Sequence, residues 1–249
     1  GGENIASNKL EEFVAEGIDY YSEGRDMPSQ NGTSTLSPYL AIGNLSPQQC
    51  LLAALSGVPG VGVDTWISEI VWRDFYQYVS WHFPWVCTHR PFNRATENIQ
   101  WRQSETDFTA WIQGKTGVPL VDAGMRQLKE IGWMHNRVRM VVAMFLSKNL
   151  LLDWRRGEKV FMNNLIDGDF PANNGGWQWS ASTGTDAAPY FRIFNPFSQA
   201  ERFDPEASYI KRYVPELKNL KPKDIHKPSR LQKMKPKTYP DCIVDIGSS

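Results

Sequence analysis

The stretch that decides the fold class is PLVDAGMRQLKEIGWMHNRVRMVVAMFLSKNLLLDWRRGEKVFMNNLI, residues 119–166. It divides into three segments whose apolar residues recur at helical spacing, 119–132, 133–152 and 153–166. Gly132 stands at the end of the first segment, where a glycine commonly closes a helix. The middle segment is the most apolar and predicts a long, largely buried helix. Consecutive helices with no strand between them predict an all-α fold.

Helical patterns also occupy most of the chain before this stretch. Amphipathic spacing predicts a helix over residues 8–22, and Ser-Pro starts predict helices over 36–43 and 45–55. A long helix is predicted over residues 64–83. No convincing alternation of apolar and polar residues predicts a strand, so the all-α prediction extends to the whole chain.

The two ends differ in composition from the rest of the chain. We expect residues 1–7 to be a flexible start and residues 8–217 to form one helical catalytic domain. Residues 218–249 are rich in Lys and Pro and are expected to extend over the surface. The chain opens GGENIASNKL without Met, which favours a fragment or a trimmed chain.

Composition excludes several classes of protein. The 249 residues carry 27 basic and 27 acidic side chains, so any contact with nucleic acid must rest on a local patch. Three widely spaced cysteines without a Cys-x-x-Cys argue against a zinc site or disulfide framework and favour an intracellular protein. No apolar run is long enough to span a bilayer, and no signal peptide is visible. The sequence also lacks the motifs of Rossmann dehydrogenases, Walker ATPases and α/β-hydrolases.

Aromatic residues are unusually frequent, with ten Trp, twelve Phe and nine Tyr. Some of these rings are expected in the core, and others along a flat-ligand pocket or a stacking surface. The stretch LIDGDFPANNGGWQWSASTGTDA, residues 165–187, gathers two Trp, an Asn pair, a Gly pair and closely spaced acids. Neither a core segment nor an ordinary loop needs all of these residues, so the stretch is a candidate site.

A second candidate is GTSTLSPYL, residues 32–40, in which the hydroxyls of residues 33–35 precede a helix start at Ser37-Pro38. Short hydroxyls and free backbone amides at a helix N-terminus suit a phosphate or pyrophosphate. Plain helix capping explains the same residues and, on this motif alone, is their more common use.

A third candidate lies on the helix predicted over residues 64–83. Four residues share one of its faces: Glu69, Trp72, Arg73 and Tyr76. An acid, a cation and two amphipathic aromatics suit the stacking and hydrogen bonding of a base, while an ion-paired solvent face is an equally weighted alternative. The opposite face is predicted to pack in the core and consists of Val71, Phe75, Tyr78 and Val79.

The segment WMHNRVRM, residues 133–140, carries a fourth set of polar residues. Asn136 and Met140 share one helix face, and Arg139 points elsewhere. Because an arginine on a largely buried helix needs a partner, the acids of the DGD triplet, Asp167 and Asp169, are the natural candidates.

These motifs together resemble a known family. GTSTLSPYL, SEIVWRDFYQYV, GWMHNRVRM and DGDFPANNGGWQWSASTGTDAAPYFRIFNP are similar to the flavin-binding half of the photolyase/cryptochrome family, over roughly residues 8–217. Class I cyclobutane pyrimidine dimer photolyases are the most similar branch. The resemblance implies an all-helical domain that holds FAD, and an N-terminal α/β antenna domain that is absent from this chain. We expect that domain, with its antenna chromophore, as a separate fragment or chain in a monomeric assembly.

The resemblance also implies which residues hold the cofactor. Arg139 and Asp167 match an ion pair beside the flavin ring, Asp169 matches a hydrogen-bonding acid, and Asn173 matches the residue that faces flavin N5. The full set implied to bind FAD is Tyr21, Thr33, Ser34, Thr35, Leu36, Ser37, Trp66, Arg73, Arg139, Asp167, Gly168, Asp169 and Asn173.

Catalytic and DNA-binding residues follow from the same resemblance. Trp177, Trp154 and Trp101 match a chain of tryptophans that passes an electron from the surface to the flavin, with Trp101 as its exposed end. Glu69 and Asn173 complete the implied catalytic set, and no metal is implied. The residues implied to contact DNA or the dimer are Arg25, Glu69, Trp72, Arg73, Tyr76, Asn136, Arg137, Met140, Trp179 and Gln199.

The implied activity is light-driven repair of cyclobutane pyrimidine dimers, by electron transfer from reduced FAD to a dimer flipped out of DNA. A cryptochrome photoreceptor is one alternative, but those branches often carry Asp or Cys where Asn173 stands. A (6-4)-photoproduct photolyase is another, but that branch places a His pair where His135 is followed by Asn136. A non-enzymatic DNA-binding fragment is the third. Each implies a location in the cytoplasm of a prokaryote or the nucleus of a eukaryote.

Overall fold

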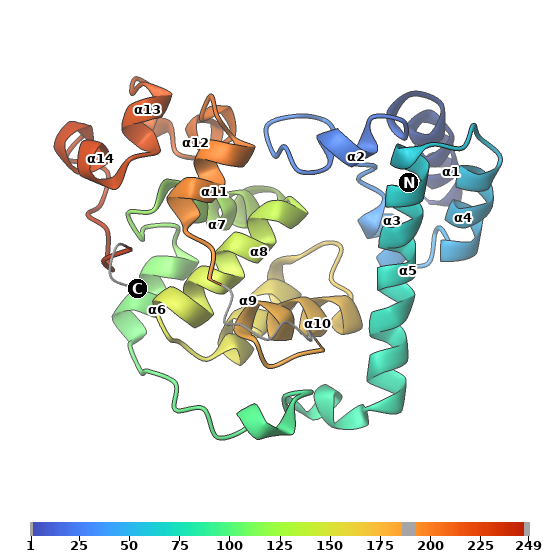
Figure 1. Ribbon diagram of the computed structural model, residues 1–249, viewed down its shortest axis with the longest axis horizontal. Coiled ribbons are helices and arrows are strands. Elements are labelled where there is room, and N and C mark those ends of the chain that lie inside the picture. Colours follow the sequence, from blue (N-terminus) through green and yellow to red (C-terminus); the bar gives the residue numbers. More distant parts are fainter. Residues whose placement is uncertain (1, 186–192, 247–249) are drawn as a thin grey trace.

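The computed structural model describes residues 2–185 and 193–246, and within these residues every regular element is a helix (Figure 1). The all-α prediction is confirmed. Within the same residues, no helix is both long and apolar enough to cross a membrane.

The helices form two groups along the chain. The first group runs from α1 (Glu3–Glu12) to α5 (Val61–His82), and the second from α6 (Glu105–Ile112) to α14 (Pro228–Met234). The remaining elements are, in order, η1 (Phe13–Gly17), α2 (Tyr21–Gly24), α3 (Ser37–Ala41), α4 (Pro47–Leu55), η2 (Pro84–Thr88), η3 (Arg94–Thr96), α7 (Pro119–Ile131), α8 (Asn136–Met144), η4 (Phe145–Asn149), α9 (Trp154–Asn164), α10 (Phe170–Ala181), α11 (Pro196–Phe203), α12 (Ser208–Tyr213), η5 (Pro215–Leu217) and α13 (Pro222–Ile225).

Each group has its own hydrophobic core. The larger core belongs to the second group and contains the buried rings of Trp111, Trp154 and Trp177. The smaller core belongs to the first group and contains Phe13 and Trp66. Large aromatic rings supply much of the buried apolar area that stabilises such cores. α5 contacts α10, so the two groups of helices meet along these two helices.

Local signals set the bounds of the helices predicted over residues 119–166. α7 ends at Gly132, whose φ of 66° is the left-handed conformation that glycine adopts at low cost. α8 begins later than predicted, because the His135 side chain accepts the N–H of Arg137 and caps the helix. Asp153 caps α9 in the same way through the N–H of Arg155.

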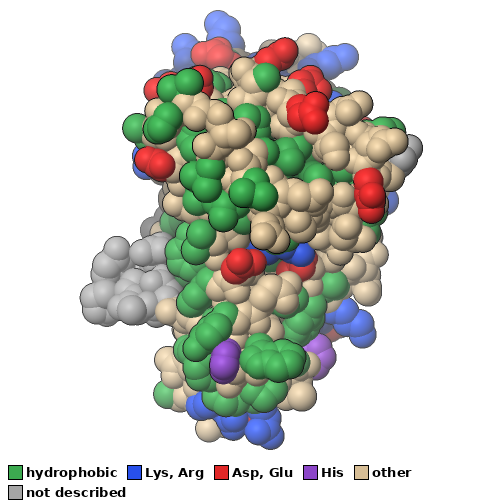
Figure 2. All heavy atoms as spheres, turned by 90° about the vertical axis from the view of Figure 1, so that its right-hand side faces the viewer, with side chains coloured by type: hydrophobic (Ala, Val, Ile, Leu, Met, Phe, Trp, Pro, Cys, Tyr) green, Lys and Arg blue, Asp and Glu red, His purple; other side chains and the backbone are tan. Residues whose placement is uncertain are grey.

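The predicted core-like face of α5 is wrong in part. Val79 is buried, but Val71 and Tyr78 are 59% and 58% exposed, and Phe75 lines a cavity. Figure 1 shows α5 at the edge of the molecule, with α1 and α4 beside its N-terminal half. Viewed onto this edge, Figure 2 shows hydrophobic side chains open to solvent. The spacing of apolar residues along a helix does not indicate whether that helix lies at the edge of the molecule.

The N-terminal end is more ordered than the expected flexible start. α1 already begins at Glu3, and Ala6 has no exposed surface. Ala6 packs into the smaller core, so this core holds the first turns of the chain in place.

The C-terminal segment is also not the extended strip that its Lys and Pro content predicted. It forms α13 and α14, and Ile225 and Leu231 are buried in the larger core. The hydroxyl of Tyr239 donates a hydrogen bond of 2.6 Å to the buried carboxylate of Asp122 on α7. A few well-spaced apolar residues are enough to dock a segment whose composition is otherwise that of a surface strip.

Candidate functional site

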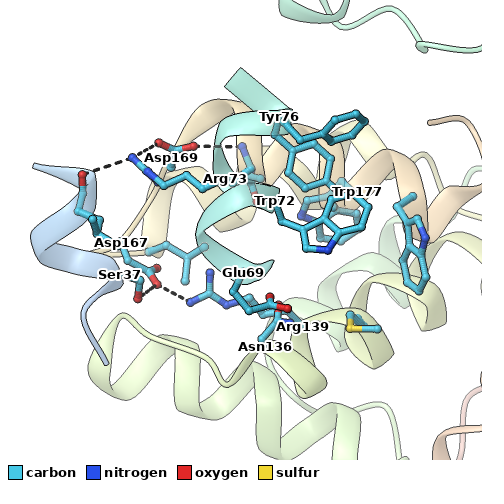
Figure 3. A pocket seen from close by; sticks show the side chains of 18 of the residues that line it. Ser37, Glu69, Trp72, Arg73, Tyr76, Asn136, Arg139, Asp167, Asp169 and Trp177 are labelled. Atoms are coloured by element: carbon cyan, nitrogen blue, oxygen red, sulfur yellow. Dashed lines mark hydrogen bonds and ion pairs between the residues drawn. The ribbon is translucent and has the colours of Figure 1, made fainter. Parts of the chain in front are cut away.

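A cavity of about 730 Å³ lies between the two cores. Side chains from α5, α8 and α10 converge on it (Figure 3). This volume falls in the range of pockets that hold large organic ligands. The predicted flavin residues that line it are Tyr21, Ser34, Ser37, Trp66, Arg73, Arg139, Asp167, Asp169 and Asn173.

The predicted pair of Arg139 and Asp167 is present in the cavity wall. Arg139 Nη2 lies 2.7 Å from Asp167 Oδ2, and Arg139 Nε donates to the carbonyl of Met134 at 2.7 Å. The Ser37 hydroxyl donates to the same Oδ2 at 2.7 Å. Only 2% of the Asp167 side chain is exposed, so these charge-assisted bonds offset the cost of burying its charge.

The second oxygen of this carboxylate tests whether the residues fit a flavin. Asp167 Oδ1 is buried and has no hydrogen-bond partner among the described residues. Such an oxygen is costly unless a donor reaches it. Elsewhere in the lining of the same cavity, a Cβ added at Gly176 would meet no atom within 4 Å, so the protein leaves space open there. A buried acceptor without a partner in a roomy cavity fits a ligand ring that carries an N–H donor.

Asp169 links two helices across the cavity. Its Oδ1 accepts the N–H of Ala172 at 3.1 Å and caps α10, while its Oδ2 lies 2.8 Å from Arg73 Nη2 on α5. Gln77 Nε2 donates to the same Oδ2 at 3.3 Å, and Arg73 also donates to the carbonyl of Leu40. Sequence reasoning missed Gln77, although its place four residues after Arg73 puts both on one face of α5.

Most of the predicted dimer-contacting residues line the same cavity, and this set is called the rim below. Trp72 is 51% exposed, and its ring centroid lies 6.0 Å from that of Tyr76. Glu69 Oε1 lies 2.7 Å from Arg25 Nη1. The predicted DNA-binding residues that line the cavity are Arg25, Glu69, Trp72, Arg73, Tyr76, Asn136, Met140 and Trp179.

Tyr21 stays a hydrogen-bond donor within this cavity. Burial raises the pKa of Tyr21 to about 12, with a smaller contribution from the Glu69 carboxylate. The guanidinium of Arg25 lies over the ring of Tyr21, 5.4 Å from its centroid. The Tyr21 hydroxyl therefore keeps its proton at every physiological pH.

Comparison with known protein families identifies the family of this chain. Residues 66–249 match the model of the FAD-binding domain of DNA photolyase. The chain belongs to this family. It is 52% identical over 235 residues to a deoxyribodipyrimidine photo-lyase of Salmonella typhimurium, covering 92% of this chain and 49% of that protein. The chain thus spans about half the length of the curated relatives it matches.

Solved structures of the photolyase and cryptochrome family share the fold. A class III photolyase from Agrobacterium tumefaciens matches with a TM-score of 0.92 and 45% identity, over 99% of this chain and 53% of that one. A cryptochrome from Synechocystis matches with a TM-score of 0.91 and 34% identity, over 100% of this chain and 54% of that one. The fold alone therefore does not separate the two branches, whereas sequence identity favours the photolyases.

Some predicted flavin residues of this domain lie outside the cavity lining. Leu36 is 1% exposed and packs in the smaller core. Leu36 is the N-cap of α3, and Ser37 is the first residue of the helix. The Ser37 hydroxyl does not cap the helix and donates to Asp167 instead. The predicted flavin residues outside the lining are Thr33, Thr35, Leu36 and Gly168.

The three tryptophans predicted to pass an electron to the flavin all pack in or against the larger core. Trp177 is 2% exposed, Trp154 is fully buried, and Trp101 is half-buried. Trp177 lines the cavity and packs onto α9 at Gly157, where a Cβ would come within 2.1 Å of the indole. Its ring contacts are with Phe161, at 5.0 Å between centroids, and Trp111, at 6.0 Å. Neither neighbour carried a recognisable signal in the sequence.

Arg137 and Gln199, predicted to contact DNA, lie outside the cavity lining. Arg137 pairs with Asp26 at 2.6 Å and lies over the ring of Phe203 at 4.4 Å. The cavity also uses residues that sequence reasoning did not single out. They are apolar or small residues outside the quoted candidate motifs, including Ala143 and Phe161.

Proposed function

We propose that this chain is the FAD-binding catalytic part of a deoxyribodipyrimidine photo-lyase, which uses light to repair cyclobutane pyrimidine dimers in DNA. One observation carries the proposal. The residues expected to hold a flavin and those expected to hold a flipped-out dimer line one continuous cavity. This proximity favours direct electron transfer, because the rate of electron transfer falls steeply with the distance between donor and acceptor, and the protein sets that distance by positioning the cofactor.

FAD is the proposed cofactor, and the wall built by Ser37, Arg139 and Asp167 is proposed to hold its ring. Bound in reduced form, FAD supplies an electron donor that light can excite. Asp167 Oδ1 would accept a ring N–H, while Arg139 and Ser37 orient that carboxylate through its other oxygen. Asn173 is proposed to face the reactive edge of the ring. Its Nδ2 is already engaged with the carbonyl of Glu158 at 3.1 Å, which fixes the amide plane.

The rim is proposed to receive the extruded dimer. Trp72 and Trp179 offer aromatic faces on which bases stack, and Asn136 and Met140 close the sides. Glu69 is paired with Arg25 in the absence of DNA. We propose that DNA phosphate attracts Arg25 away. The Glu69 carboxyl is then proposed to form a hydrogen bond with the dimer.

Activation of oxidised flavin is proposed to use Trp177, Trp154 and Trp101. Trp177 is placed to give an electron to a flavin in the cavity because it lines that cavity. Trp101 is the best surface end of the three because it alone is not fully buried. Each electron that moves inward leaves a positive hole that moves outward, and solvent reductant fills the hole at Trp101.

The remaining partners are proposed from the relatives. They are about twice as long as this chain, and we propose that an antenna domain carrying a second chromophore works with this one in a monomeric, intracellular enzyme. Thr33, Thr35, Leu36 and Gly168 are proposed to complete the cofactor site through backbone or through movement on binding. Arg137 and Gln199 are proposed to contact DNA beyond the rim.

A repair assay tests the proposal. The chain, reduced and loaded with FAD, is mixed with an oligonucleotide that contains one thymine dimer, and loss of the dimer is measured under blue light and in the dark. We expect repair only in the light. Flavin that is reduced by light, in a chain that repairs no dimer and does not prefer damaged DNA, would favour a cryptochrome photoreceptor instead.

A further inference from the structure

The middle of α10 contains two adjacent glycines, Gly175 and Gly176. An interior glycine destabilises a helix relative to alanine, so each position is expected to have a packing reason. A Cβ added at Gly176 would meet no atom within 4 Å. A Cβ added at Gly175 would lie 2.9 Å from Cγ of Tyr76 on α5, and closer still to its Cδ1 and Cε1. The Tyr76 ring therefore lies directly on the backbone of α10 at Gly175.

This contact involves the two helix faces that carry the tryptophans of the rim. Trp72 stands four residues before Tyr76 on α5, and Trp179 stands four residues after Gly175 on α10, so each shares a helix face with one member of the contact. The rings of Trp72 and Tyr76 extend to the same side of α5 (Figure 3), with their centroids 6.0 Å apart. Both tryptophans line the cavity. The spacing of α5 and α10 at this contact is therefore expected to set their relative positions.

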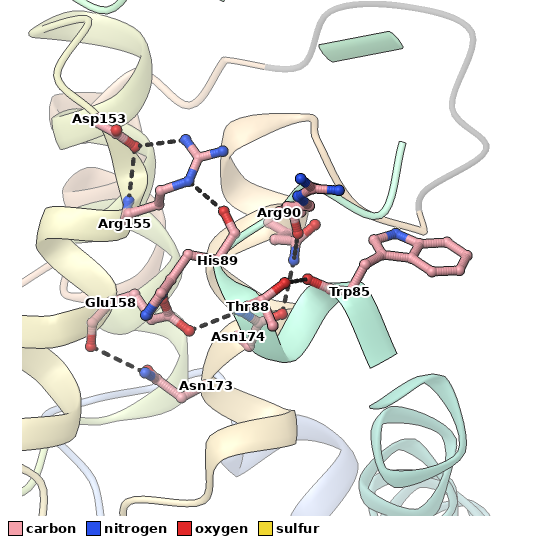
Figure 4. Close-up of polar contacts among 10 residues, drawn as sticks. Trp85, Thr88, His89, Arg90, Asp153, Arg155, Glu158, Asn173 and Asn174 are labelled. Carbon is pink, nitrogen blue, oxygen red and sulfur yellow. Dashed lines mark hydrogen bonds and ion pairs between the residues drawn. The ribbon is translucent and has the colours of Figure 1, made fainter. Parts of the chain in front are cut away.

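α10 is fixed on its other side, against α9. Asn173 Nδ2 donates to the carbonyl of Glu158 at 3.1 Å, and Asn174 Nδ2 donates to Glu158 Oε1 at 2.8 Å (Figure 4). The Trp177 indole packs closely on Gly157 of α9. Two side-chain amides and a buried ring thus hold α10 in place on α9.

α5 has solvent on its outer face at the level of Tyr76, where Val71 and Tyr78 are exposed. The ion pair of Arg73 with Asp169 also joins α5 to α10, but at the start of α10, which leaves Tyr76 as the contact in its middle. A methyl group added at Gly175 would collide even with Cγ of Tyr76, which stays in place when the ring turns about its own axis. The collision would therefore displace the whole Tyr76 side chain or α5, and leave α10 on α9.

We propose that Tyr76, lying on Gly175, is a positioning residue that sets the separation of α5 and α10, and with it the width of the cavity between Trp72 and Trp179 that an extruded dimer enters. The identity of that ligand rests on the proposed function, whereas the contact between Tyr76 and Gly175 does not.

The part of the cavity proposed to hold the flavin should depend less on this contact. The bonds that link Ser37, Arg139 and Asp167 do not involve α5. The bond from Asn173 to α9 does not involve α5 either. A change at Gly175 should therefore reduce the binding of a dimer by more than it reduces the retention of FAD.

The contact is tested first by the unfolding equilibrium of the full chain, without FAD or DNA. Gly176→Ala adds a methyl group that meets no atom of the protein, so helix propensity alone should lower the unfolding constant by roughly two- to fivefold. Gly175→Ala brings the same gain in propensity but displaces Tyr76. Its unfolding constant should exceed that of Gly176→Ala by roughly five- to a hundredfold. Combined with Tyr76→Ala, Gly175→Ala should lose this excess, because the methyl group then occupies the space of the ring.

The role in the cavity is tested by binding of DNA duplexes, with and without one thymine dimer, to the chain loaded with FAD. Gly175→Ala should weaken binding of the dimer-containing duplex by roughly tenfold, as expected if one base loses its stacking on Trp72. Binding of the undamaged duplex and retention of FAD should change less. The same loss should appear when Tyr76→Phe, which keeps the ring, is also present, and with the matched control Tyr78→Ala on the same helix. It should be absent when Tyr76→Ala is also present.

A loss of dimer binding from Gly175→Ala that is as large with Tyr76→Ala as in the unchanged chain would overturn the inference, and so would equal losses of dimer binding and FAD retention. If Gly175→Ala does not fold, Tyr76→Ala decides: it should lower the preference for damaged over undamaged DNA, and an unchanged preference would overturn the inference. Coupling of Gly175 and Tyr76 in the unfolding measurement, in a chain that has no preference for dimers, would refute the proposed function and leave the spacing role of Tyr76 supported.

Discussion

Arg139 and Asp167 are 28 positions apart in the chain, yet Arg139 Nη2 and Asp167 Oδ2 lie 2.7 Å apart in the cavity wall. The bond joins α8 to the segment that precedes α10, and the Ser37 hydroxyl from the first group of helices reaches the same oxygen. One carboxylate thus ties the two halves of the fold together where the flavin is proposed to lie.

Replacing this carboxylate should weaken cofactor binding. Asp167→Asn keeps the size of the side chain but leaves Arg139 without its charged partner. We expect FAD retention to fall by about 1–3 kcal/mol, the usual cost of a lost charge-assisted hydrogen bond. The measurement is flavin occupancy after gel filtration. Asp74→Asn, at an exposed position on α5, is the control and should retain FAD normally. Equal flavin occupancy in the two variants would show that Asp167 does not help to hold FAD.

The hydroxyl-rich loop offers a sharper comparison. Ser34 lines the cavity and Thr33 does not. Ser34→Ala should therefore weaken FAD retention by about 1 kcal/mol or more, and Thr33→Ala should do so only if the loop moves on binding. A titration of each chain with FAD, followed by quenching of flavin fluorescence, measures the difference. A larger effect at Thr33 than at Ser34 would mean that the loop rearranges around the cofactor.

The electron route can be tested at its inner end. Trp177→Phe should abolish the photoreduction of oxidised flavin, because phenylalanine is much harder to oxidise than tryptophan. It should spare repair by enzyme that has been reduced chemically. Trp111→Phe is the matched control, since Trp111 is also a buried ring in contact with Trp177 but lies outside the proposed route. If Trp111→Phe slows photoreduction as much as Trp177→Phe does, the electron reaches the flavin by way of Trp111.

Recognition of the lesion should depend on Trp72. Base–aromatic stacking contributes about 1–3 kcal/mol per base, so Trp72→Ala should weaken binding to dimer-containing DNA by roughly ten- to a hundredfold. Binding to undamaged DNA rests on phosphate contacts and should change little. Trp81→Ala is the control, because Trp81 lies on the same helix, is 82% exposed and does not line the cavity. Equal losses for damaged and undamaged DNA would make Trp72 a general contact.

Buried His135 should make the fold sensitive to mild acid. Burial is the main cause that lowers the pKa of His135 to about 4, from an ordinary value of 6.5. The unfolded chain therefore binds a proton first, and stability should fall as pH drops from about 6.5 toward 4, by an amount on the order of 2–4 kcal/mol. Urea unfolding at several pH values measures this loss. His135→Asn retains a capping acceptor and should flatten the profile, whereas exposed His82→Asn should not.

The sequence by itself determined the elements that short-range interactions control. Gly132 closes α7 and Ser46 caps α4, because capping involves residues within one turn of each other. The four residues of α5 that share a face, Glu69, Trp72, Arg73 and Tyr76, do line one cavity, since helical periodicity alone sets their common direction. The functional roles of these residues came from the resemblance of their motifs to a family, because residue spacing alone does not specify a role.

Only the tertiary structure decided which faces meet and which stay open. Val71 and Tyr78 were predicted to be buried, but α5 lies at the edge of the molecule, and exposure depends on neighbours that the helix itself does not specify. Asp167 could have paired with any nearby cation. It became a site residue because segments distant in the chain packed against it and removed water, which makes a buried charge depend on its exact partners.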